Sequence, residues 1–157
     1  MKKKKNVMFI SSVGGHLTQM LELKSIFADY NYILITEKTD ITINMSKDYK
    51  MDYLLYGSRQ YLVKYLFIFI CNFFKTIYLF FKYNPKVIVT TGTHTAVVMC
   101  YLGWLFRRKV VFIESFAKRT SKTLSGKLVY PIATVFVVQW KSMLKLYPKA
   151  KYFGGIY

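Results

Sequence analysis

Hydrophobic residues along this chain gather in short runs that are separated by longer mixed segments. Six runs rich in β-branched and aromatic residues predict strands, and most of them are apolar throughout. Strands of that kind are covered on both faces, as in a parallel sheet with a helix layer on each side. Strands are expected at residues 7–10, 32–36, 53–55, 87–91, 110–114 and 135–138, and helices at 16–28, 59–83, 95–106, 125–133 and 141–146.

The order of these elements predicts the fold class α/β, a Rossmann-like parallel sheet with helices on both faces. The chain has 157 residues, which is enough for one ordinary hydrophobic core and too few for two. We therefore expect residues 1–157 to form a single lobe. An activity that requires two lobes then depends on a second chain.

Residues 59–83 form the most hydrophobic part of the sequence. A helix turns by about 100° per residue, which places the lysines and the asparagine of this segment within one narrow stripe. These residues are Lys64, Asn72, Lys75 and Lys82. A crossover helix packed on a sheet accounts for one apolar side, but here most of the circumference is apolar. We expect an amphipathic helix that packs on the sheet and also contacts a membrane, with its lysines at the lipid head groups.

A bilayer span is the less expected arrangement for this segment. Its longest run without a charge, residues 65–74, has ten residues, whereas a spanning helix needs about 20. Lysines 2–5 form a basic leader over residues 1–6, and the apolar run after it is too short for a signal peptide. Cys71 and Cys100 lie in apolar segments without metal-ligand spacing, which indicates reduced residues and no metal site. We expect peripheral or monotopic attachment at the cytoplasmic face of a membrane.

Positive charge is concentrated in the last two thirds of the chain. The net charge is +17, and residues 53–157 hold 16 Lys and Arg against a single acid, Glu114. A surface of this kind attracts polyanions such as anionic lipids, lipid-linked diphosphates or nucleic acid. The aromatic content of 18% favours lipid, and no recognised nucleic-acid motif accompanies the charge. We therefore expect no nucleic-acid partner.

The first predicted strand passes into a helix through a small polar loop, "SSVGGH", residues 11–16. Glycines let a ligand approach the backbone, and amides at a helix start attract anions or sugar hydroxyls. The loop is neither a dinucleotide fingerprint nor a P-loop. Its ligand-facing candidates are Ser12, Gly14, Gly15 and His16. The alternative is a tight turn whose histidine only packs locally.

A second loop, "TTGTHT", follows the strand expected at residues 87–91. It offers hydroxyls, backbone freedom and a histidine through Thr91, Gly92, Thr93 and His94. Loops that follow strands of one parallel sheet lie at the same carboxyl edge, where such folds bind ligands. The two loops are therefore expected to form one site, although His94 on its own is equally explained as a solvent-facing side chain.

A third strand end carries Glu114 and Ser115, followed by a basic loop with Lys118, Arg119 and Lys122. Glu114 is interpreted either as an ion-pair partner or as an acceptor of hydrogen bonds from a hydroxylated ligand. The three cations are interpreted either as a diphosphate site or as a solvated loop. The sequence shows no paired carboxylates and no nucleophile elbow, so ordinary hydrolase chemistry is not expected.

Several of these stretches together resemble one family. "ISSVGGHLTQMLEL", "VIVTTGTHTAV", "FIESFAKRTSKTLSGKLVYPIATVFVVQW" and "YPKAKYFGG" are similar to the acceptor-side subunits of two-chain glycosyltransferases. This group includes capsule and exopolysaccharide proteins of the PssD type and the membrane-anchored subunit of the eukaryotic enzyme that adds the second GlcNAc to dolichol diphosphate. The chain is more distantly similar to the N-terminal lobe of MurG. The resemblance covers nearly the whole chain. The eukaryotic subunits carry an N-terminal spanning helix, whereas this sequence has lysines 2–5 there, so membrane attachment is expected to come from residues 61–83 and basic residues or from the partner.

The resemblance implies the N-terminal lobe of a GT-B glycosyltransferase. It implies that this chain binds a lipid-linked sugar acceptor, while a small catalytic partner holds the nucleotide sugar and this chain binds no cofactor of its own. His16 is then the first candidate for a catalytic base and Glu114 the second. Residues 91–94 and Ser115 are also expected to contact the acceptor. Contacts with phosphates or the membrane are expected from Lys64, Lys75, Lys82, Lys118, Arg119 and Lys122. The product is expected to be a capsule or exopolysaccharide, and the alternative function is a purely structural membrane scaffold that recruits and activates the partner.

Overall fold

The computed structural model describes residues 4–57 and 62–156, and within them seven strands form one sheet. Every neighbouring pair is parallel, and the strand order is β3-β2-β1-β4-β5-β6-β7. The strands are β1 (Asn6–Ile10), β2 (Asn31–Glu37), β3 (Met51–Leu54), β4 (Val87–Thr90), β5 (Lys109–Ile113), β6 (Val135–Val138) and β7 (Lys151–Tyr152). The predicted fold class is confirmed, and all six predicted strands are present.

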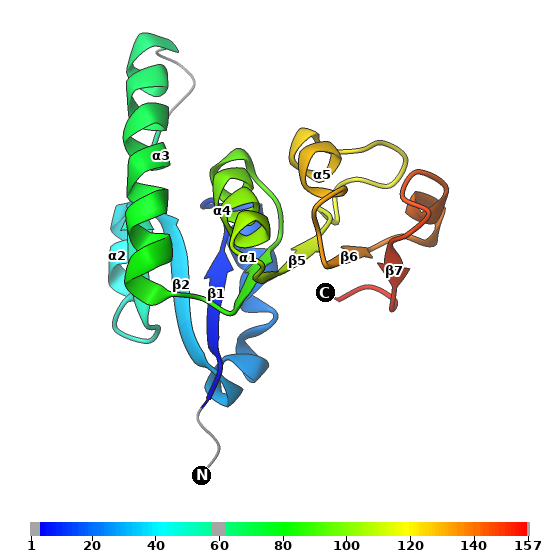
Figure 1. Ribbon diagram of the computed structural model, residues 1–157, viewed down its shortest axis with the longest axis horizontal. Coiled ribbons are helices and arrows are strands. Elements are labelled where there is room, and N and C mark those ends of the chain that lie inside the picture. The colour runs from blue at the N-terminus through cyan, green and yellow to red at the C-terminus, as the bar shows by residue number, and fades with distance from the viewer. Residues whose placement is uncertain (1–3, 58–61, 157) are drawn as a thin grey trace.

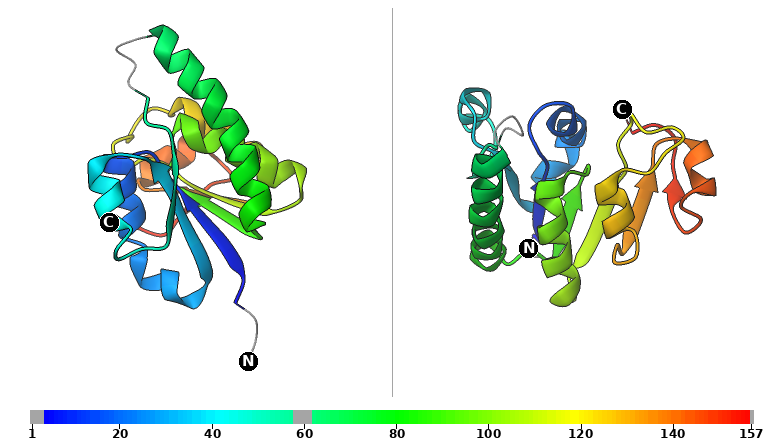
Figure 2. Two further views of the ribbon diagram at one scale, coloured as in Figure 1. Left: turned by 90° about the vertical axis from the view of Figure 1, so that its left-hand side faces the viewer. Right: turned by 90° about the horizontal axis from the view of Figure 1, so that it is seen from above.

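Helices cover both faces of the sheet. On one face lie α3 (Leu62–Tyr83), α4 (His94–Leu105) and α5 (Leu124–Val129), and on the other lie α1 (Gly15–Leu21) and α2 (Asp40–Met45), as the view from above shows (Figure 2). Two 3-10 helices, η1 (Lys24–Asp29) and η2 (Lys141–Lys145), complete the described elements.

The central strands are mostly apolar because they supply side chains to both layers. In β1, Met8 and Ile10 join the core under α3 and α4, whereas Val7 and Phe9 join the core under α1. All four side chains are at most 3% exposed. The continuous hydrophobic pattern therefore reports burial from two sides, as expected for parallel strands.

Some predicted boundaries are wrong, and two elements are missed. The helix expected at 16–28 ends at Leu21, and the 3-10 helix η1 follows it. The segments expected as helices at 125–133 and 141–146 are the six-residue α5 and the 3-10 helix η2. The missed elements, α2 and β7, have six and two residues, too few for a hydrophobic period to appear. The expected start of the long helix at 59–61 lies outside the described residues.

The long helix α3 packs on the sheet through a side that contains Asn72 of its polar stripe, with Leu79 and Phe80 in the core. Asn72 is buried, and its side chain accepts a hydrogen bond from the N–H of Leu55 at 2.7 Å and donates one to the carbonyl of Leu55 at 2.8 Å. Lys82 pairs with Asp52 at 2.8 Å. Of the lysines that are expected at lipid head groups, Lys82 thus already has a carboxylate partner within the fold.

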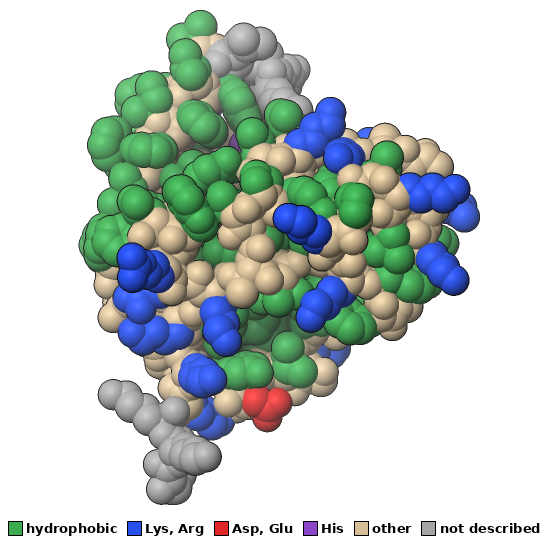
Figure 3. All heavy atoms as spheres, turned by 45° about the vertical axis from the view of Figure 1, so that its right-hand side comes forward, with side chains coloured by type: hydrophobic (Ala, Val, Ile, Leu, Met, Phe, Trp, Pro, Cys, Tyr) green, Lys and Arg blue, Asp and Glu red, His purple; other side chains and the backbone are tan. Residues whose placement is uncertain are grey.

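The outer side of α3 is apolar and uncovered. Its amino-terminal end extends beyond the sheet (Figure 1). Exposed side chains, between 42% and 86% accessible, form what we call the outer face of α3: Val63, Leu66, Phe67, Ile70, Phe73, Phe74, Tyr78 and Phe81. Hydrophobic side chains dominate this part of the surface in Figure 3. Among the described residues, α3 is the one helix that is long and apolar enough to cross a membrane, and 22% of its most apolar window is buried.

Candidate functional site

The first two predicted loops meet at the carboxyl edge of the sheet, between β1 and β4. These strands are neighbours, but the chain leaves β1 towards α1 on one face and leaves β4 towards α4 on the other. Such a point, where successive connections diverge, opens a crevice at the strand ends and is the usual ligand position in open α/β sheets.

His16 and Thr91 join the two loops by a reciprocal pair of hydrogen bonds. The ring nitrogen Nδ1 of His16 lies 2.9 Å from the carbonyl oxygen of Thr91, and the Thr91 hydroxyl donates to the carbonyl of His16 at 2.8 Å. A carbonyl oxygen only accepts, so Nδ1 must carry the proton in this contact. In the neutral ring Nε2 is then the atom with a free lone pair.

The turn from β4 into α4 holds an unusual backbone. Gly92 has φ 96°, and Thr93 has φ 128° and ψ 160°, a region that is essentially restricted to glycine. A β-branched residue there costs on the order of 1–3 kcal/mol. The Thr93 side chain shares a 2.7 Å hydrogen bond with the Thr95 hydroxyl, and the Thr93 N–H donates to Ser125 Oγ at 3.4 Å. Strain of this kind is typical of residues that shape a site.

The two loops border a groove of about 590 Å³. Ser12 and His16 line it from the first loop, and Thr93 and His94 from the second. The other lining residues, which the sequence analysis missed, are Phe69, Val97, Val98, Thr123, Leu124, Ser125 and Leu128. A mostly apolar hollow of this size with a few converging polar groups is typical of a ligand site. We call it the carboxyl-edge groove.

The remaining predicted loop residues lie near this groove and are not part of its lining. Gly14 and Gly15 are exposed, and Gly92 packs between Phe112 and His16. Ser115 is buried beside Glu114. A signal for the missed wall was available in the sequence, because Thr123 stands before a short helix as an N-cap residue does, and its side chain accepts from the N–H of Gly126.

Glu114 is turned into the protein and away from the groove. Its carboxylate is 1% exposed and accepts hydrogen bonds from the Ser115 N–H at 2.9 Å, the Thr123 hydroxyl at 2.8 Å and the Tyr147 hydroxyl at 2.7 Å. Burial, together with the hydrogen bond to Glu114, raises the pKa of Tyr147. The geometry makes Glu114 an anchor of the following loop, and neither sequence interpretation, ion pair or ligand acceptor, describes its contacts.

The basic loop lies to one side of the groove. Arg119 stacks its guanidinium 4.2 Å from the centre of the Trp140 ring, and Lys122 lies 4.9 Å from the centre of the Tyr147 ring. The residues that line the groove include none of the cations of the described chain. Lys118, Arg119 and Lys122 are therefore not among the residues that line the groove.

Glu37, at the end of β2, supports the first loop. Its carboxylate accepts a hydrogen bond from the N–H of Val13 at 3.2 Å and is 5% exposed. Burial raises the pKa of Glu37, because the ionised form loses water, and the Val13 hydrogen bond offsets part of that rise. No sequence motif marked this residue, since it lies 24 positions from the loop that it holds.

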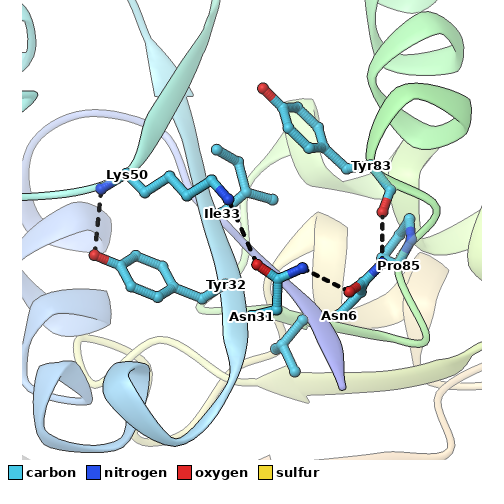
Figure 4. Close-up of a pocket in the computed structure, with 8 residues that line it drawn as sticks. Asn6, Asn31, Tyr32, Ile33, Lys50, Tyr83 and Pro85 are labelled. Atoms are coloured by element: carbon cyan, nitrogen blue, oxygen red, sulfur yellow. Dashed lines mark hydrogen bonds between the residues drawn. The ribbon is translucent and has the colours of Figure 1, made fainter. Parts of the chain in front are cut away.

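The amino edge of the sheet has two hollows. One, of about 510 Å³, lies where β6 and β7 begin, beside Thr134, Lys149 and Lys151. The other, between β1 and β2, has a volume of about 20 Å³, which is close to the space of one water molecule. Its polar groups bond to each other: Asn31 donates to Asn6 at 2.8 Å, and Asn6 donates to the carbonyl of Tyr83 at 3.2 Å (Figure 4). The described residues contain no group of three or more His, Cys, Asp or Glu that is arranged to hold a metal.

The family of this chain follows from its sequence. A family model described as "Oligosaccharide biosynthesis protein Alg14 like" matches residues 56–156, which include both the long helix and the second and third loops. The chain belongs to this family. Curated relatives include proteins called UDP-N-acetylglucosamine transferase subunit ALG14 from Yarrowia lipolytica, Debaryomyces hansenii and Homo sapiens.

The extent of these similarities differs. The Yarrowia lipolytica protein is 34% identical over 53% of this chain and 41% of its own length, so the match spans less than half of that relative. The Debaryomyces hansenii protein is 26% identical over 95% of this chain and 75% of its own length. The human protein is 22% identical over 96% of this chain and 82% of its own length.

Solved structures share the fold. MurG from Acinetobacter baumannii superposes with a TM-score of 0.69 at 14% identity, over 88% of this chain and 42% of MurG. UDP-N-acetylglucosamine 2-epimerase from Rickettsia bellii gives a TM-score of 0.71 at 13% identity, over 98% of this chain and 45% of the epimerase. The fold is therefore the Rossmann-like one of a GT-B N-terminal lobe.

Proposed function

We propose that this chain is the acceptor-binding, membrane-docking subunit of a two-chain glycosyltransferase. Its acceptor is a sugar linked through a diphosphate to a lipid, and the donor is a nucleotide sugar held by a partner chain. The observation that carries the proposal is the position of the carboxyl-edge groove, which lies at the divergence of β1 and β4 and extends to Phe69 on the exposed helix α3.

His16 is the residue that we assign to the reacting acceptor hydroxyl. The Thr91 carbonyl fixes its tautomer, so that Nε2 is the atom available to accept the hydroxyl proton. In the transfer, the acceptor oxygen forms a bond to the anomeric carbon of the donor sugar as the bond to the nucleotide diphosphate breaks. The proton passes to the base, and the diphosphate leaves with the bonding electron pair.

The partner supplies what the groove lacks. The lining of the groove has no cation for a departing nucleotide diphosphate, and the similarity to MurG covers 42% of that enzyme. The names of the curated relatives support UDP-N-acetylglucosamine as the donor and a transferase of more than one subunit. In this proposal a small catalytic chain closes over the carboxyl edge with the nucleotide sugar bound to it.

Membrane docking is assigned to the outer face of α3. Its exposed aromatic and aliphatic side chains run along the whole helix, with Lys64 exposed near one end. A helix that is apolar along one side and packed on a soluble domain along the other is suited to lie in the bilayer interface. The proposed attachment is peripheral or monotopic, at the cytoplasmic leaflet.

The proposal is tested by reconstitution in membranes. Membranes with this chain alone are expected to transfer almost no GlcNAc from UDP-GlcNAc to a lipid-diphosphate-linked acceptor, and addition of the partner is expected to raise transfer strongly. In the complex, His16→Ala is expected to lower kcat at least about 100-fold without changing binding to vesicles. Full transfer by this chain without a partner contradicts the two-chain assignment.

A membrane scaffold is the second candidate function. It is favoured by one observation, which is that Glu114 and the Nδ1 atom of His16 both make their hydrogen bonds within the fold. The scaffold predicts that His16→Ala leaves transfer unchanged while the pair Lys64→Glu and Lys75→Glu abolishes it. The opposite pattern, loss with His16→Ala alone, supports acceptor binding.

The identity of the polymer to which the sugar contributes is a separate question from the two-chain assignment. The matched relatives are named as UDP-N-acetylglucosamine transferase subunits, and none of these names refers to a capsule or an exopolysaccharide. The relatives therefore support a lipid-linked oligosaccharide intermediate better than a capsule. Analysis of lipid extracts after disruption of the gene tests which lipid-linked sugar accumulates.

A further inference from the structure

The carboxyl-edge groove continues along α4 as a crevice between α3 and α4. A narrow neck of about 20 Å³ adjoins it, and the two share Phe69, His94 and Val98. Beyond the neck lies a further hollow of about 180 Å³, which shares Phe73 and Val98 with the neck. The three hollows thus follow one line from the strand ends towards the far end of α4.

The two ends of this line differ in polarity, and the neck between them is lined in part by Asn72, Thr76 and Thr95. Ser12, His16 and Thr93 stand at the first end. The far hollow is lined by Phe73, Val98, Tyr101, Leu102, Trp104 and Leu105, which are all apolar or aromatic. Trp104 and Leu105 are 55% and 65% exposed, so the hollow presents apolar surface that the described chain leaves uncovered. Exposed apolar surface of this kind marks a binding region.

The length and the surroundings of the crevice fit one extended hydrocarbon chain. From His94 to Leu105 the helix rises by roughly 16 Å. Phe73 belongs both to the wall of the crevice and to the outer face of α3, so the crevice opens onto the surface assigned to the bilayer. A lipid-linked diphosphate has its charge at one end and its hydrocarbon at the other, and the two ends of the crevice differ in the same way.

We propose that the crevice between α3 and α4 holds the first part of the hydrocarbon chain of the lipid-linked acceptor. This inference rests on the proposed acceptor-binding function and adds the route of the lipid. The polar head lies at His16 and Thr93, the chain passes Val98, and it leaves beside Trp104 into the bilayer. The crevice then selects acceptors by the length of their hydrocarbon chain, because burial of hydrocarbon contributes about 0.8 kcal/mol for each CH₂ group.

Photo-crosslinking tests this route. The probe is geranylgeranyl diphosphate with a diazirine near the end of its chain, added to the full chain on vesicles that contain phosphatidylglycerol. Saturable labelling within residues 98–105 is expected, and the labelled peptides are identified by mass spectrometry. The same probe without its diphosphate, a labelled geranylgeraniol, is expected to label the outer face of α3 without saturation.

Variants separate the crevice from the membrane surface. Val98→Trp fills the crevice and is expected to lower saturable labelling at least fivefold, whereas Ile41→Trp, at an exposed position of α2 on the other face of the sheet, is expected to leave it unchanged. Val98 is partly buried, so a thermal unfolding curve accompanies this variant. Leu105→Glu is a second test at a more exposed position, and the same loss is expected.

The outcomes distinguish this inference from the proposed function. Saturable labelling that depends on the diphosphate but avoids residues 98–105, or that is insensitive to Val98→Trp and Leu105→Glu, overturns the crevice and leaves acceptor binding standing. Equal labelling by the probe with and without diphosphate shows that bilayer lipid fills the crevice and overturns the inference. The absence of saturable binding anywhere on the chain overturns both.

Discussion

The carboxylate of Glu114 joins three segments of the chain, because its hydrogen-bond donors are Ser115, Thr123 and Tyr147. Thr123 is also the N-cap of α5 and part of the groove wall. A buried carboxylate is tolerated only when its oxygens are saturated with donors. Glu114 therefore positions, through Thr123, the α5 wall of the carboxyl-edge groove.

Gly126 is the position at which the packing around the Glu114 carboxylate is tested most directly. A Cβ atom at this position would lie 2.5 Å from Tyr147 Oη and 2.8 Å from Thr123 Oγ1. Gly126→Ala is expected to reduce the free energy of unfolding by about 1–3 kcal/mol, as overpacking does. Denaturant unfolding measures the change. Gly15→Ala is the matched control, because nothing lies within 4 Å of its added Cβ, and an equal loss in both variants contradicts the packing argument.

Glu37 is expected to make the free energy of unfolding depend on pH. Burial raises the pKa of Glu37 above its usual value, so the folded protein binds the proton more tightly than the unfolded chain does. The free energy of unfolding is then expected to fall as the pH rises from about 4.3 through the raised pKa. Glu37→Gln retains an acceptor for the Val13 N–H and cannot ionise.

Urea unfolding across that pH range compares the two proteins. The Glu37→Gln variant is expected to lose the part of the pH dependence that Glu37 contributes and to be at least as stable as the parent at about pH 7. A variant that is clearly less stable at about pH 7 shows instead that the ionised carboxylate holds the Gly-Gly-His loop.

At the level of elements, α3 is apolar on its outer face as well as on its buried side. The buried side combines Leu79 and Phe80 of the core with the polar residues Asn72 and Thr76, while the outer face is made of large apolar side chains. Asn72 is accommodated there because it satisfies both backbone groups of Leu55. A surface helix of a protein in water exposes polar side chains, so α3 is suited to a lipid environment on its outer side.

Charges on the outer face of α3 are expected to prevent membrane binding. Phe67 and Phe74 are 68% and 65% exposed, and burying a phenylalanine contributes about 1.5–3 kcal/mol. Phe67→Asp with Phe74→Asp is therefore expected to lower partitioning into vesicles at least about tenfold, measured by co-sedimentation. Ile41→Asp serves as control, since Ile41 is 76% exposed on α2 on the other face of the sheet. Unchanged partitioning of the Phe67/Phe74 variant refutes α3 as the docking element.

The elements differed in how well their sequence predicted them. Strands were found because burial on two faces leaves an unbroken apolar run, as in residues 7–10. The long helix was found from its length and composition. The short α2 depends on a cap formed by Thr39 and Thr42, and β7 depends only on pairing with β6. Contacts of that kind leave no hydrophobic period in the sequence.

At the scale of the whole molecule, the positive charges are spread over the surface and do not gather at one binding site. Lys and Arg side chains are spread over much of the face shown in Figure 3, where acidic side chains are scarce. The net charge of residues 53–157 is +15, from 16 cations and one acid. Basic residues near an anionic bilayer contribute about 1 kcal/mol each. In the proposed membrane docking, the positive charge and the apolar outer face of α3 therefore act together.

Salt is expected to separate these two contributions. Binding to vesicles that contain phosphatidylglycerol should weaken by about tenfold or more between low and physiological ionic strength, because salt screens the charge. Binding to neutral phosphatidylcholine vesicles should be weaker and nearly independent of salt, because it relies on apolar burial. Flotation assays at several salt concentrations measure both. Equal salt dependence on both lipids contradicts the electrostatic contribution.

The sequence by itself determined the sheet, the layer order, the excess of positive charge and the loops that follow the strands, because each depends on local composition or on burial from two sides. It also predicted His16, Thr93 and His94 as residues of the carboxyl-edge groove, since polar residues that follow parallel strands lie at one edge of the sheet. Only the tertiary structure decided which side of α3 is buried, that Glu114 faces inward and that Glu37 holds a loop 24 residues away. These properties depend on contacts between distant segments, and such contacts exist only after the chain has folded.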